Sequence, residues 1–271
     1  MKTTIGFIGA GNITSAIIPS IISNEFCLSK DIIIFDIDSE KLEALKSTYD
    51  INVASSIEEL ARKSDIIVVA VKPFVLESVL KELELFIDNQ TIISTVAGVT
   101  TETILNTLKG NIKLARIMPN IGAMIGESMT ALVTKNMEND NLDVIHKFFL
   151  SFGTYITLEE KHFNEFTTLC GSSPAFFADI FNTFITYGMS KGIDEKSVRK
   201  MVLSTIQGTA KILMSTPLNE EALISKVATK GGTTEAGLNV MKERNLDQIL
   251  LESFRATTNK AQELSNDTKK S

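Results

Sequence analysis

The sequence predicts an α/β protein with an N-terminal, Rossmann-type, doubly wound parallel sheet and an all-helical C-terminal domain. Up to about residue 160, apolar runs of strand length alternate with amphipathic helical patterns, as in a parallel sheet with crossover helices. After about residue 162, strand-like runs disappear and long helical periodicities take over. We therefore expect two domains, 1–160 and 161–271.

The first domain shows five short apolar runs that predict buried parallel strands, at residues 4–8, 32–35, 66–71, 91–96 and 113–117. Helical patterns follow them at 13–22, 39–46, 57–63, 75–86 and 101–108. Two further strand-like pieces, 128–133 and 154–158, flank a helix near 141–151, and we expect them to complete the edge of the sheet. Ser39 and Ser56 are expected N-caps.

The second domain shows helical patterns at 173–191, 195–214, 219–225, 233–243 and 247–264. Asp194 is an expected N-cap and Gly192 an expected C-cap. Residues 266–271 are expected to form a frayed tail.

Composition excludes several classes of protein. The 271 residues are 44% hydrophobic and 22% charged with a net charge of −6, and no basic block offers a nucleic-acid surface. No apolar run reaches the ~18 residues of a membrane span, and no secretory signal is recognisable, so we expect a cytoplasmic protein without membrane or nucleic-acid partners. Cysteines and histidines lack the spacing of a disulfide framework or metal site.

A glycine-rich turn follows the first predicted strand and opens the first helix. It comprises Gly9, Ala10, Gly11, Asn12, Ile13 and Thr14. Gly9 permits the tight turn, Gly11 allows close approach of a pyrophosphate, and the helix N-terminus binds the anion. Thr14 stands where glycine or alanine usually lets helix and strand pack closely. The sequence predicts a dinucleotide site here; the alternative is an ordinary glycine-rich turn.

Asp36 ends the second predicted strand, 25 residues after Gly11. A carboxylate at this place accepts hydrogen bonds from the ribose hydroxyls and repels a 2′-phosphate. Asp38 adds a second negative charge, and no arginine is close by in the sequence. NADH is therefore favoured over NADPH; the alternative is an aspartate that only caps the turn.

Six short motifs, in order along nearly the whole chain, together resemble the pyrroline-5-carboxylate reductase family. They are Gly9–Asn12, Ala70-Val71-Lys72-Pro73, Ala97-Gly98-Val99, Met118-Pro119-Asn120, Gly171-Ser172-Ser173-Pro174-Ala175 and Gly231-Gly232-Thr233-Thr234-Glu235-Ala236-Gly237-Leu238. The resemblance implies NAD(P)H-dependent reduction of 1-pyrroline-5-carboxylate to L-proline, the last step of proline biosynthesis. It also implies homodimers formed through the helical domains, in some members stacked into decamers.

The same motifs indicate site residues. The expected cofactor contacts beyond the glycine turn and Asp36 are Ala70, Val71, Lys72, Pro73, Ala97, Gly98 and Asn120. The expected substrate contacts are Glu160, Ser172, Lys226, Gly231, Gly232, Thr233 and Thr234, with Glu160 and Lys226 assigned by the resemblance alone. Reduction of a cyclic imine needs little acid–base machinery, because the cofactor carries the hydride.

Thr234 is the candidate catalytic residue, since its hydroxyl can hydrogen-bond the imine nitrogen. Backbone N–H groups of Gly231, Gly232 and Thr233 can bind the substrate carboxylate at a helix N-terminus. The alternative for both threonines is plain helix capping, and for Glu160 and Lys226 it is solvated surface charge.

The sequence leaves two alternative functions open and argues strongly against a third. A β-hydroxyacid dehydrogenase shares the two-domain plan but needs a lysine acid–base in the long helix, and residues 172–190 contain no lysine. A related cyclic-imine reductase or a non-catalytic dinucleotide-binding regulator would also retain the intact glycines.

Overall fold

The computed structural model describes residues 3–267, without the side chains of residues 139–141, 266 and 267. The chain divides into two compact units: residues 1–171 with 258–271, and residues 172–257. The functional division between residues 160 and 161 stays a prediction. Helix α12 (Leu246–Asp267) includes Asn266 and Asp267, so the expected fraying is wrong there, and the rest of the expected tail, 268–271, lies outside the described residues.

The first unit is built on an eight-stranded sheet with the order β3-β2-β1-β4-β5-β6-β7-β8. The strands are β1 (Ile5–Ile8), β2 (Ile32–Phe35), β3 (Asn52–Val53), β4 (Ile66–Val69), β5 (Thr91–Ser94), β6 (Lys113–Met118), β7 (Ser128–Lys135) and β8 (Gly153–Thr157). The chain order reverses at β1, between β2 and β4, which is where doubly wound sheets bind ligands. The predicted Rossmann-type sheet is confirmed.

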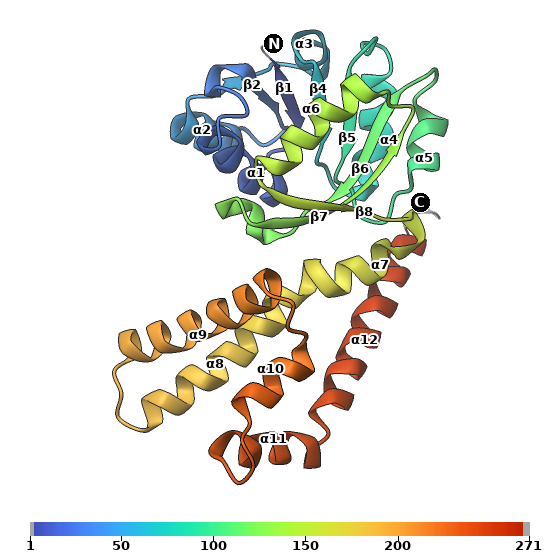
Figure 1. Cartoon of the computed structure of the whole chain (residues 1–271). Helices are drawn as coiled ribbons and strands as arrows, with labels where there is room; N and C mark the ends of the chain where they lie inside the picture. The colour runs from blue at the N-terminus through green and yellow to red at the C-terminus, as the bar shows by residue number, and fades with distance from the viewer. Residues whose placement is uncertain (1–2, 268–271) are drawn as a thin grey trace. The chain divides into compact units, whose positions relative to one another are not determined.

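Helices cover both faces of this sheet (Figure 1). They are α1 (Asn12–Ser23), α2 (Ser39–Tyr49), α3 (Ile57–Lys63), α4 (Pro73–Leu83), α5 (Thr101–Thr107) and α6 (Asn139–Leu150). Apolar side chains of α1 and α6 pack on one face, and those of α3, α4 and α5 pack on the other. The central strands β1 and β4 are buried along their whole length, which explains their continuous apolar sequence.

Two details of the sheet were not part of the sequence prediction. Strand β7 runs antiparallel to β6, because the connection 119–127 is too short for the crossover that a parallel neighbour requires. The two-residue edge strand β3 was not predicted, since both of its residues are exposed and carry no apolar pattern. Strand β8 returns parallel to β7 through α6, and both strands complete the edge as expected.

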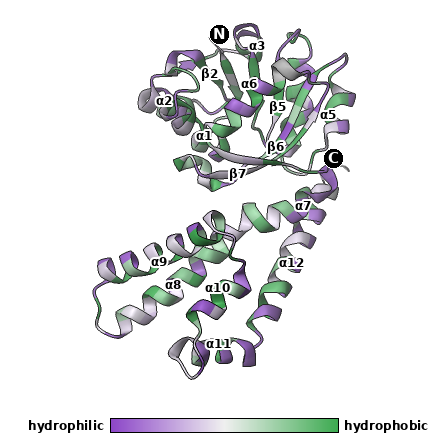
Figure 2. Cartoon of the chain, viewed as in Figure 1, coloured by the Kyte–Doolittle hydropathy of each residue, from purple (hydrophilic) through white to green (hydrophobic). Residues whose placement is uncertain are grey.

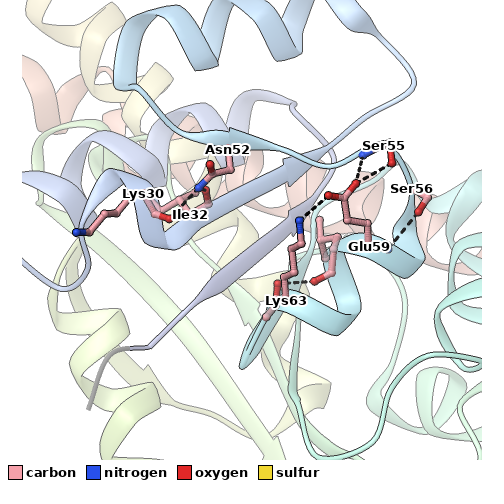
Figure 3. Close-up of polar contacts among 9 residues, drawn as sticks. Lys30, Ile32, Asn52, Ser55, Ser56, Glu59 and Lys63 are labelled. Carbon is pink, nitrogen blue, oxygen red and sulfur yellow. Dashed lines mark hydrogen bonds and ion pairs between the residues drawn. The ribbon is translucent and has the colours of Figure 1, made fainter.

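A side-chain cap fixes the start of helix α3, which follows the edge strand β3 (Figure 3). The Ser56 hydroxyl accepts from the Glu59 N–H, as predicted, and Glu59 in turn accepts from the Ser55 N–H and pairs with Lys63 at 2.6 Å. These contacts lower the pKa of Glu59 to about 2, mainly through the Lys63 hydrogen bond. The Asn52 amide, also in Figure 3, donates to the Lys30 carbonyl.

Helix α2 begins one residue earlier than its predicted cap implied. Asp38, not Ser39, is the N-cap, because its carboxylate accepts from the N–H groups of Glu40 and Lys41. Lys41 also pairs with Asp38 at 2.8 Å and lowers the pKa of that carboxyl. The charge of Lys41 is thereby neutralised beside the acidic end of β2.

The second unit contains the helices α8 (Ser173–Ser190), α9 (Glu195–Ser215), α10 (Glu220–Val227), α11 (Thr233–Glu243) and the first half of α12. Helices α8 and α9 form an antiparallel hairpin in which Gly188 lets Val198 approach closely. Asp194 caps α9 as predicted. Figure 2 shows hydrophobic positions along α8, yet Phe177 and Phe184 are both 53% exposed.

Among residues 172–257, all of which the structure describes, only Ser173, Ile185 and Val198 are buried. The unit therefore has almost no core of its own. Across residues 3–267, none of the helices is long and apolar enough to cross a bilayer.

Candidate functional site

The glycine turn lies between the ends of β1, β2 and β4. Gly9 has φ +109°, and a Cβ at this position would lie 2.5 Å from the Ala70 carbonyl oxygen. The Gly9 N–H donates to the Phe35 carbonyl at 2.8 Å. Only glycine satisfies both the positive φ and the close approach, so the first glycine of the motif is required by the backbone itself.

Gly11 has a different role, at the N-terminus of α1. It is the N-cap residue, and no side chain caps this end of the helix. A Cβ on Gly11 would meet no atom within 4 Å, so the space before the helix is open. The first N–H groups of α1, from Asn12 and Ile13 onward, have no helical acceptor and can bind phosphate oxygens there. These residues fit a dinucleotide pyrophosphate.

Thr14, the unusual third position of the motif, is fully buried against the turn. Its hydroxyl donates to the Gly9 carbonyl at 2.6 Å. The threonine thus closes the turn on itself instead of only widening the gap between helix and strand.

Asp36 lies directly beside this turn. One carboxylate oxygen accepts from the Ala10 N–H at 2.6 Å, and the other accepts from the Asp38 N–H at 2.9 Å. Its neighbour Ile37 is 95% exposed. The two bonds fix the carboxylate at the end of β2, next to the glycine turn.

The loops that follow β4 and β5 begin at the carboxyl ends of these strands, at the same end of the sheet as the glycine turn. Ala70 donates to the Ile8 carbonyl at 2.8 Å, and Lys72 caps α4, with Pro73 in its first turn. Proline there fixes the start of the helix without loss of a backbone bond. Gly98 has φ +78° in the loop between β5 and α5. The expected cofactor residues Ala70–Pro73, Ala97 and Gly98 thus follow strands next to the glycine turn.

Glu160 lies in an ion-pair network within the first unit. Its carboxylate accepts from Arg116 at 2.7 Å and from the N–H and hydroxyl of Thr101 at 2.7 and 3.0 Å. The Arg116 side chain is 6% exposed, and its guanidinium lies 4.4 Å from the ring centre of Phe163. A hollow of about 300 Å³ adjoins the network and is also lined by Gly98. Both Glu160 oxygens are already engaged, and direct substrate contact by Glu160 stays a prediction.

Asn120 is also held by the protein. Its side-chain amide donates to the Cys170 carbonyl at 3.1 Å, and its side-chain oxygen accepts from the Gly122 N–H at 3.0 Å. Its backbone N–H donates to the Ser128 hydroxyl at 3.1 Å. Contact of Asn120 with the cofactor stays a prediction.

The glycine–threonine turn opens α11 in the second unit. Gly231 has φ +76°, and its N–H donates to the Glu235 carboxylate at 2.7 Å. The Gly232 N–H donates to the Thr229 carbonyl at 2.9 Å. Two of the three N–H groups expected to bind a carboxylate are therefore used within the turn. The N–H groups of Thr233 and Thr234, in the first turn of α11, have no helical acceptor.

The other expected substrate residues lie on different elements. Ser172 is the N-cap of α8 and makes no side-chain cap hydrogen bond. Lys226 is exposed in the last turn of α10. Burial raises the pKa of the Cys170 thiol, which keeps it protonated and argues against a nucleophile beside Ser172.

Sequence reasoning missed Arg116 and Thr101 in the Glu160 network. A charged residue inside the apolar run 113–117 signals a buried charge that needs a partner. The partner Glu160 is 44 residues away in the sequence, so no local spacing could identify it.

The sheet order, the glycine turn and the acidic end of β2 define the first unit as a dinucleotide-binding domain of the Rossmann type. A family model described as NADP oxidoreductase coenzyme F420-dependent matches residues 4–98. A second, described as pyrroline-5-carboxylate reductase dimerisation, matches residues 160–264.

Similarity to individual proteins extends over nearly the full length. A pyrroline-5-carboxylate reductase of Staphylococcus saprophyticus is 30% identical over 96% of this chain and 97% of that protein. One of Aquifex aeolicus is 31% identical with the same coverage. The crystal structure of 1-pyrroline-5-carboxylate reductase from Streptococcus pyogenes has a TM-score of 0.86 at 28% identity, covering 97% of this chain and 99% of that one. The chain belongs to the pyrroline-5-carboxylate reductase family, which confirms the resemblance.

Proposed function

We propose that this protein reduces 1-pyrroline-5-carboxylate to L-proline with NAD(P)H, as the last step of proline biosynthesis. The observation that carries the proposal is the retention of both functional turns in a chain about 30% identical, over nearly its full length, to named reductases. The dinucleotide turn at Gly9–Asn12 is open to phosphate. The Gly231–Thr234 turn opens a helix without a side-chain cap.

The chemistry needs few ionisable groups. When bound, NAD(P)H would supply a hydride to the imine carbon and leave as NAD(P)+, and the ring nitrogen would take a proton from water. The π bond of the C=N group is then replaced by new C–H and N–H bonds, and the C–N single bond remains. In our proposal the Thr234 hydroxyl hydrogen-bonds the ring nitrogen and orients it. The N–H groups of Thr233 and Thr234, with the positive end of α11, hold the substrate carboxylate.

A coupled assay tests this function directly. Purified protein is mixed with 1-pyrroline-5-carboxylate and NADH or NADPH; loss of reduced-cofactor absorbance and formation of proline are followed together. Proline formed in step with cofactor oxidation is expected. Tight NADH binding without turnover of any cyclic imine would instead favour a dinucleotide-binding regulator, and turnover of other cyclic imines alone would favour a related imine reductase.

Thr234 provides the variant that tests the site. Thr234→Val keeps the shape of the side chain and removes the hydroxyl. We expect kcat to fall about 10-fold to 100-fold with unchanged affinity for NADH, because only an interaction with the imine is lost. Thr229→Val is the matched control in the same turn, since its side chain is not assigned to substrate. Equal kcat values for the two variants would contradict the role of Thr234.

We propose NADH as the preferred cofactor. Asp36 is fixed at the ribose end of the glycine turn by the Ala10 and Asp38 N–H groups. A 2′-phosphate would meet the charges of both aspartates, and the nearby Lys41 is already paired with Asp38. The repulsion between the two aspartates and a 2′-phosphate is therefore expected to exceed any attraction of that phosphate to Lys41.

The preference is read from kcat/KM for the two cofactors. NADH is expected to exceed NADPH by about tenfold or more. Asp36→Asn keeps an acceptor oxygen but removes the charge. This variant should bring the kcat/KM values for NADH and NADPH closer together. A wild-type preference for NADPH would contradict the proposal.

We propose that the working form is at least a homodimer joined through the helical domains. The support is the match of residues 160–264 to a dimerisation family and the exposed apolar side chains of the helical unit, such as Tyr187 at 67% and Met214 at 85%. Native mass measurement distinguishes a dimer from dimers stacked into decamers.

We propose a cytoplasmic location as well. Cys27 and Cys170 are both free, and free thiols fit a reducing compartment. Cell fractionation with an antibody to the protein tests the location, and recovery in the membrane or secreted fraction would contradict it.

A further inference from the structure

The segment before the helical unit, residues 160–171, packs against one face of β6. We call residues 160–171 the stem; it comprises η3 (Glu160–His162), α7 (Phe163–Phe166) and most of the π-helical turn η4 (Thr167–Ser172). Side chains two residues apart on a strand point to the same face. Two such positions, and the residue two beyond the end of the strand, contact the stem in sequence. Arg116 pairs with Glu160, the Met118 sulfur lies 2.9 Å from the Thr167 hydroxyl oxygen, and Asn120 donates to the Cys170 carbonyl at 3.1 Å.

A small apolar core supports the same contact. Phe163 and Phe166 of the stem are buried against Ala131 of β7, with Met118 and Cys170 packed around them. This cluster is separate from the two main cores of the sheet. The stem, residues 160–171, therefore belongs to the first unit, and Asn120 contacts it one residue before its end.

The Asn120 bond meets a carbonyl that the helix cannot satisfy in the usual way. In an α-helix, the Cys170 carbonyl would accept from residue 174, but residue 174 is proline and has no N–H. The chain forms the wider π turn η4 directly before Pro174. π turns are rare in proteins, and those that do occur are often found at functional sites. The Asn120 amide donates to this carbonyl from outside the helix.

The orientation of the Asn120 amide follows from its partners. Its side-chain oxygen must be the atom that accepts from the Gly122 N–H, and its nitrogen must then face the Cys170 carbonyl. The same oxygen caps the 3₁₀ helix η2 (Ile121–Ile125). Asn120 thus ties the end of β6 both to its own loop and to the stem.

We propose that Asn120 is a positioning residue that fixes the π turn η4, which carries Gly171 and Ser172, and thereby holds Ser172 in place for hydride transfer to the substrate. The inference rests on the proposed function, because it assumes that Ser172 lies in the substrate site. It gives Asn120 a role through Cys170 rather than through direct contact with cofactor. Misplacement of reacting groups by about 1 Å can cost about 100-fold in rate.

The test compares two asparagines with the same type of bond. Asn120→Asp keeps the acceptor for Gly122 and replaces the donor to Cys170 by an oxygen. Asn136→Asp is the matched control, because the Asn136 amide donates to the Ile112 carbonyl, also at 3.1 Å, at the opposite end of the β6–β7 pair. Asn120→Asp is expected to lower kcat about 10-fold to 100-fold, with NADH affinity within about twofold, and Asn136→Asp to leave kcat within about twofold.

A measurement without cofactor or substrate reports the same contact. Amide hydrogen exchange at residues 167–172 should be faster in Asn120→Asp than in wild type or Asn136→Asp. If the wild type reduces no cyclic imine, the proposed function fails, whereas the exchange experiment still tests the contact. Unchanged exchange, or equal kcat in the two variants, overturns the proposal.

Pro174→Ala provides a second and independent variant. It gives residue 174 an N–H that can bond to the Cys170 carbonyl and compete with the Asn120 amide for it. We expect Asn120→Asp to accelerate exchange at residues 167–172 much less in the Pro174→Ala background than in wild type. Equal acceleration in both backgrounds would show that the two residues act independently.

Discussion

The two units of this protein differ in how they bury their apolar side chains. In the sheet-containing unit, Phe7, Ile17, Ile34 and Phe148 are completely buried within one chain. In residues 172–257, the phenylalanines Phe177 and Phe184 of α8 are half exposed, and only three residues are buried at all. The first unit contains its own core, whereas the second presents exposed apolar faces, which a second copy would cover in the proposed dimer. The difference implies that cofactor binding and oligomer assembly can be disrupted separately.

The largest expected effect comes from charging the exposed face of α8. In Phe177→Asp with Phe184→Asp, each ring loses about 1.5–3 kcal/mol of burial in the assembled protein. We expect loss of the dimer, reduced helical circular dichroism and a loss of activity of about 100-fold or more. The control is Leu85→Asp, a similarly exposed apolar residue of the first unit at 73%. If the double variant were still active and dimeric, the exposed face of α8 would not be the dimer interface.

Next in size is the Arg116–Glu160 pair inside the first unit. Arg116→Met leaves a largely buried carboxylate without its cation, and removal of one partner from a buried pair costs about 3–5 kcal/mol. Glu160 is 23% exposed, so the lower end is expected in urea unfolding. Adding Glu160→Gln to this variant should recover part of the loss. If Glu160→Gln alone abolished substrate binding without any loss of stability, Glu160 would act on substrate instead.

Two glycine variants in the glycine turn should have different effects on stability and on cofactor binding. Gly9→Ala places a Cβ against the Ala70 carbonyl at positive φ, so we expect a loss of about 1–3 kcal/mol of stability together with weaker NADH binding. Gly11→Ala adds a Cβ that meets nothing within 4 Å. It should therefore leave thermal stability nearly unchanged and weaken NADH binding alone. Equal melting temperatures for the two variants would contradict this division of roles.

The smallest effect concerns acid stability at the edge of the sheet. The pKa of Glu59 is lowered from 4.5 to about 2 in the folded protein, so the carboxylate stabilises the fold above pH 4.5 and this contribution is lost between those two values. Glu59→Gln should lack that part of the pH dependence and be slightly less stable at neutral pH. Glu58→Gln is the control, since Glu58 pairs with Arg62 on the same helix but caps nothing. Identical acid profiles in wild type and Glu59→Gln would refute the assignment.

Much of the first unit could be predicted because its signals are local. Buried parallel strands are continuously apolar, and caps such as Ser56 and Asp194 act within three residues. The edge strand β3 escaped prediction because two exposed residues carry no pattern. The antiparallel turn into β7 depends on the length of one connection rather than on residue type.

The candidate site also contains residues that the sequence could predict and contacts that it could not. Gly9, Gly11 and Asp36 were identifiable because a phosphate-binding turn imposes fixed residue types at fixed spacing. The partners of Glu160 and Asn120 were not, since Arg116 and Cys170 are distant in sequence and become neighbours only when β6 packs against the stem. The use of the Gly231 and Gly232 N–H groups inside their own turn also required the structure.

The sequence by itself determined the sheet-then-helices order, the dinucleotide turn and the family, because periodicity, glycine placement and motif order are properties of the chain. The tertiary structure alone decided that Glu160 and Asn120 are tied to the protein through Arg116 and Cys170. It also showed that the helical unit buries almost nothing by itself. The physical reason is that long-range polar pairing and burial depend on which surfaces meet, and no local pattern encodes that meeting.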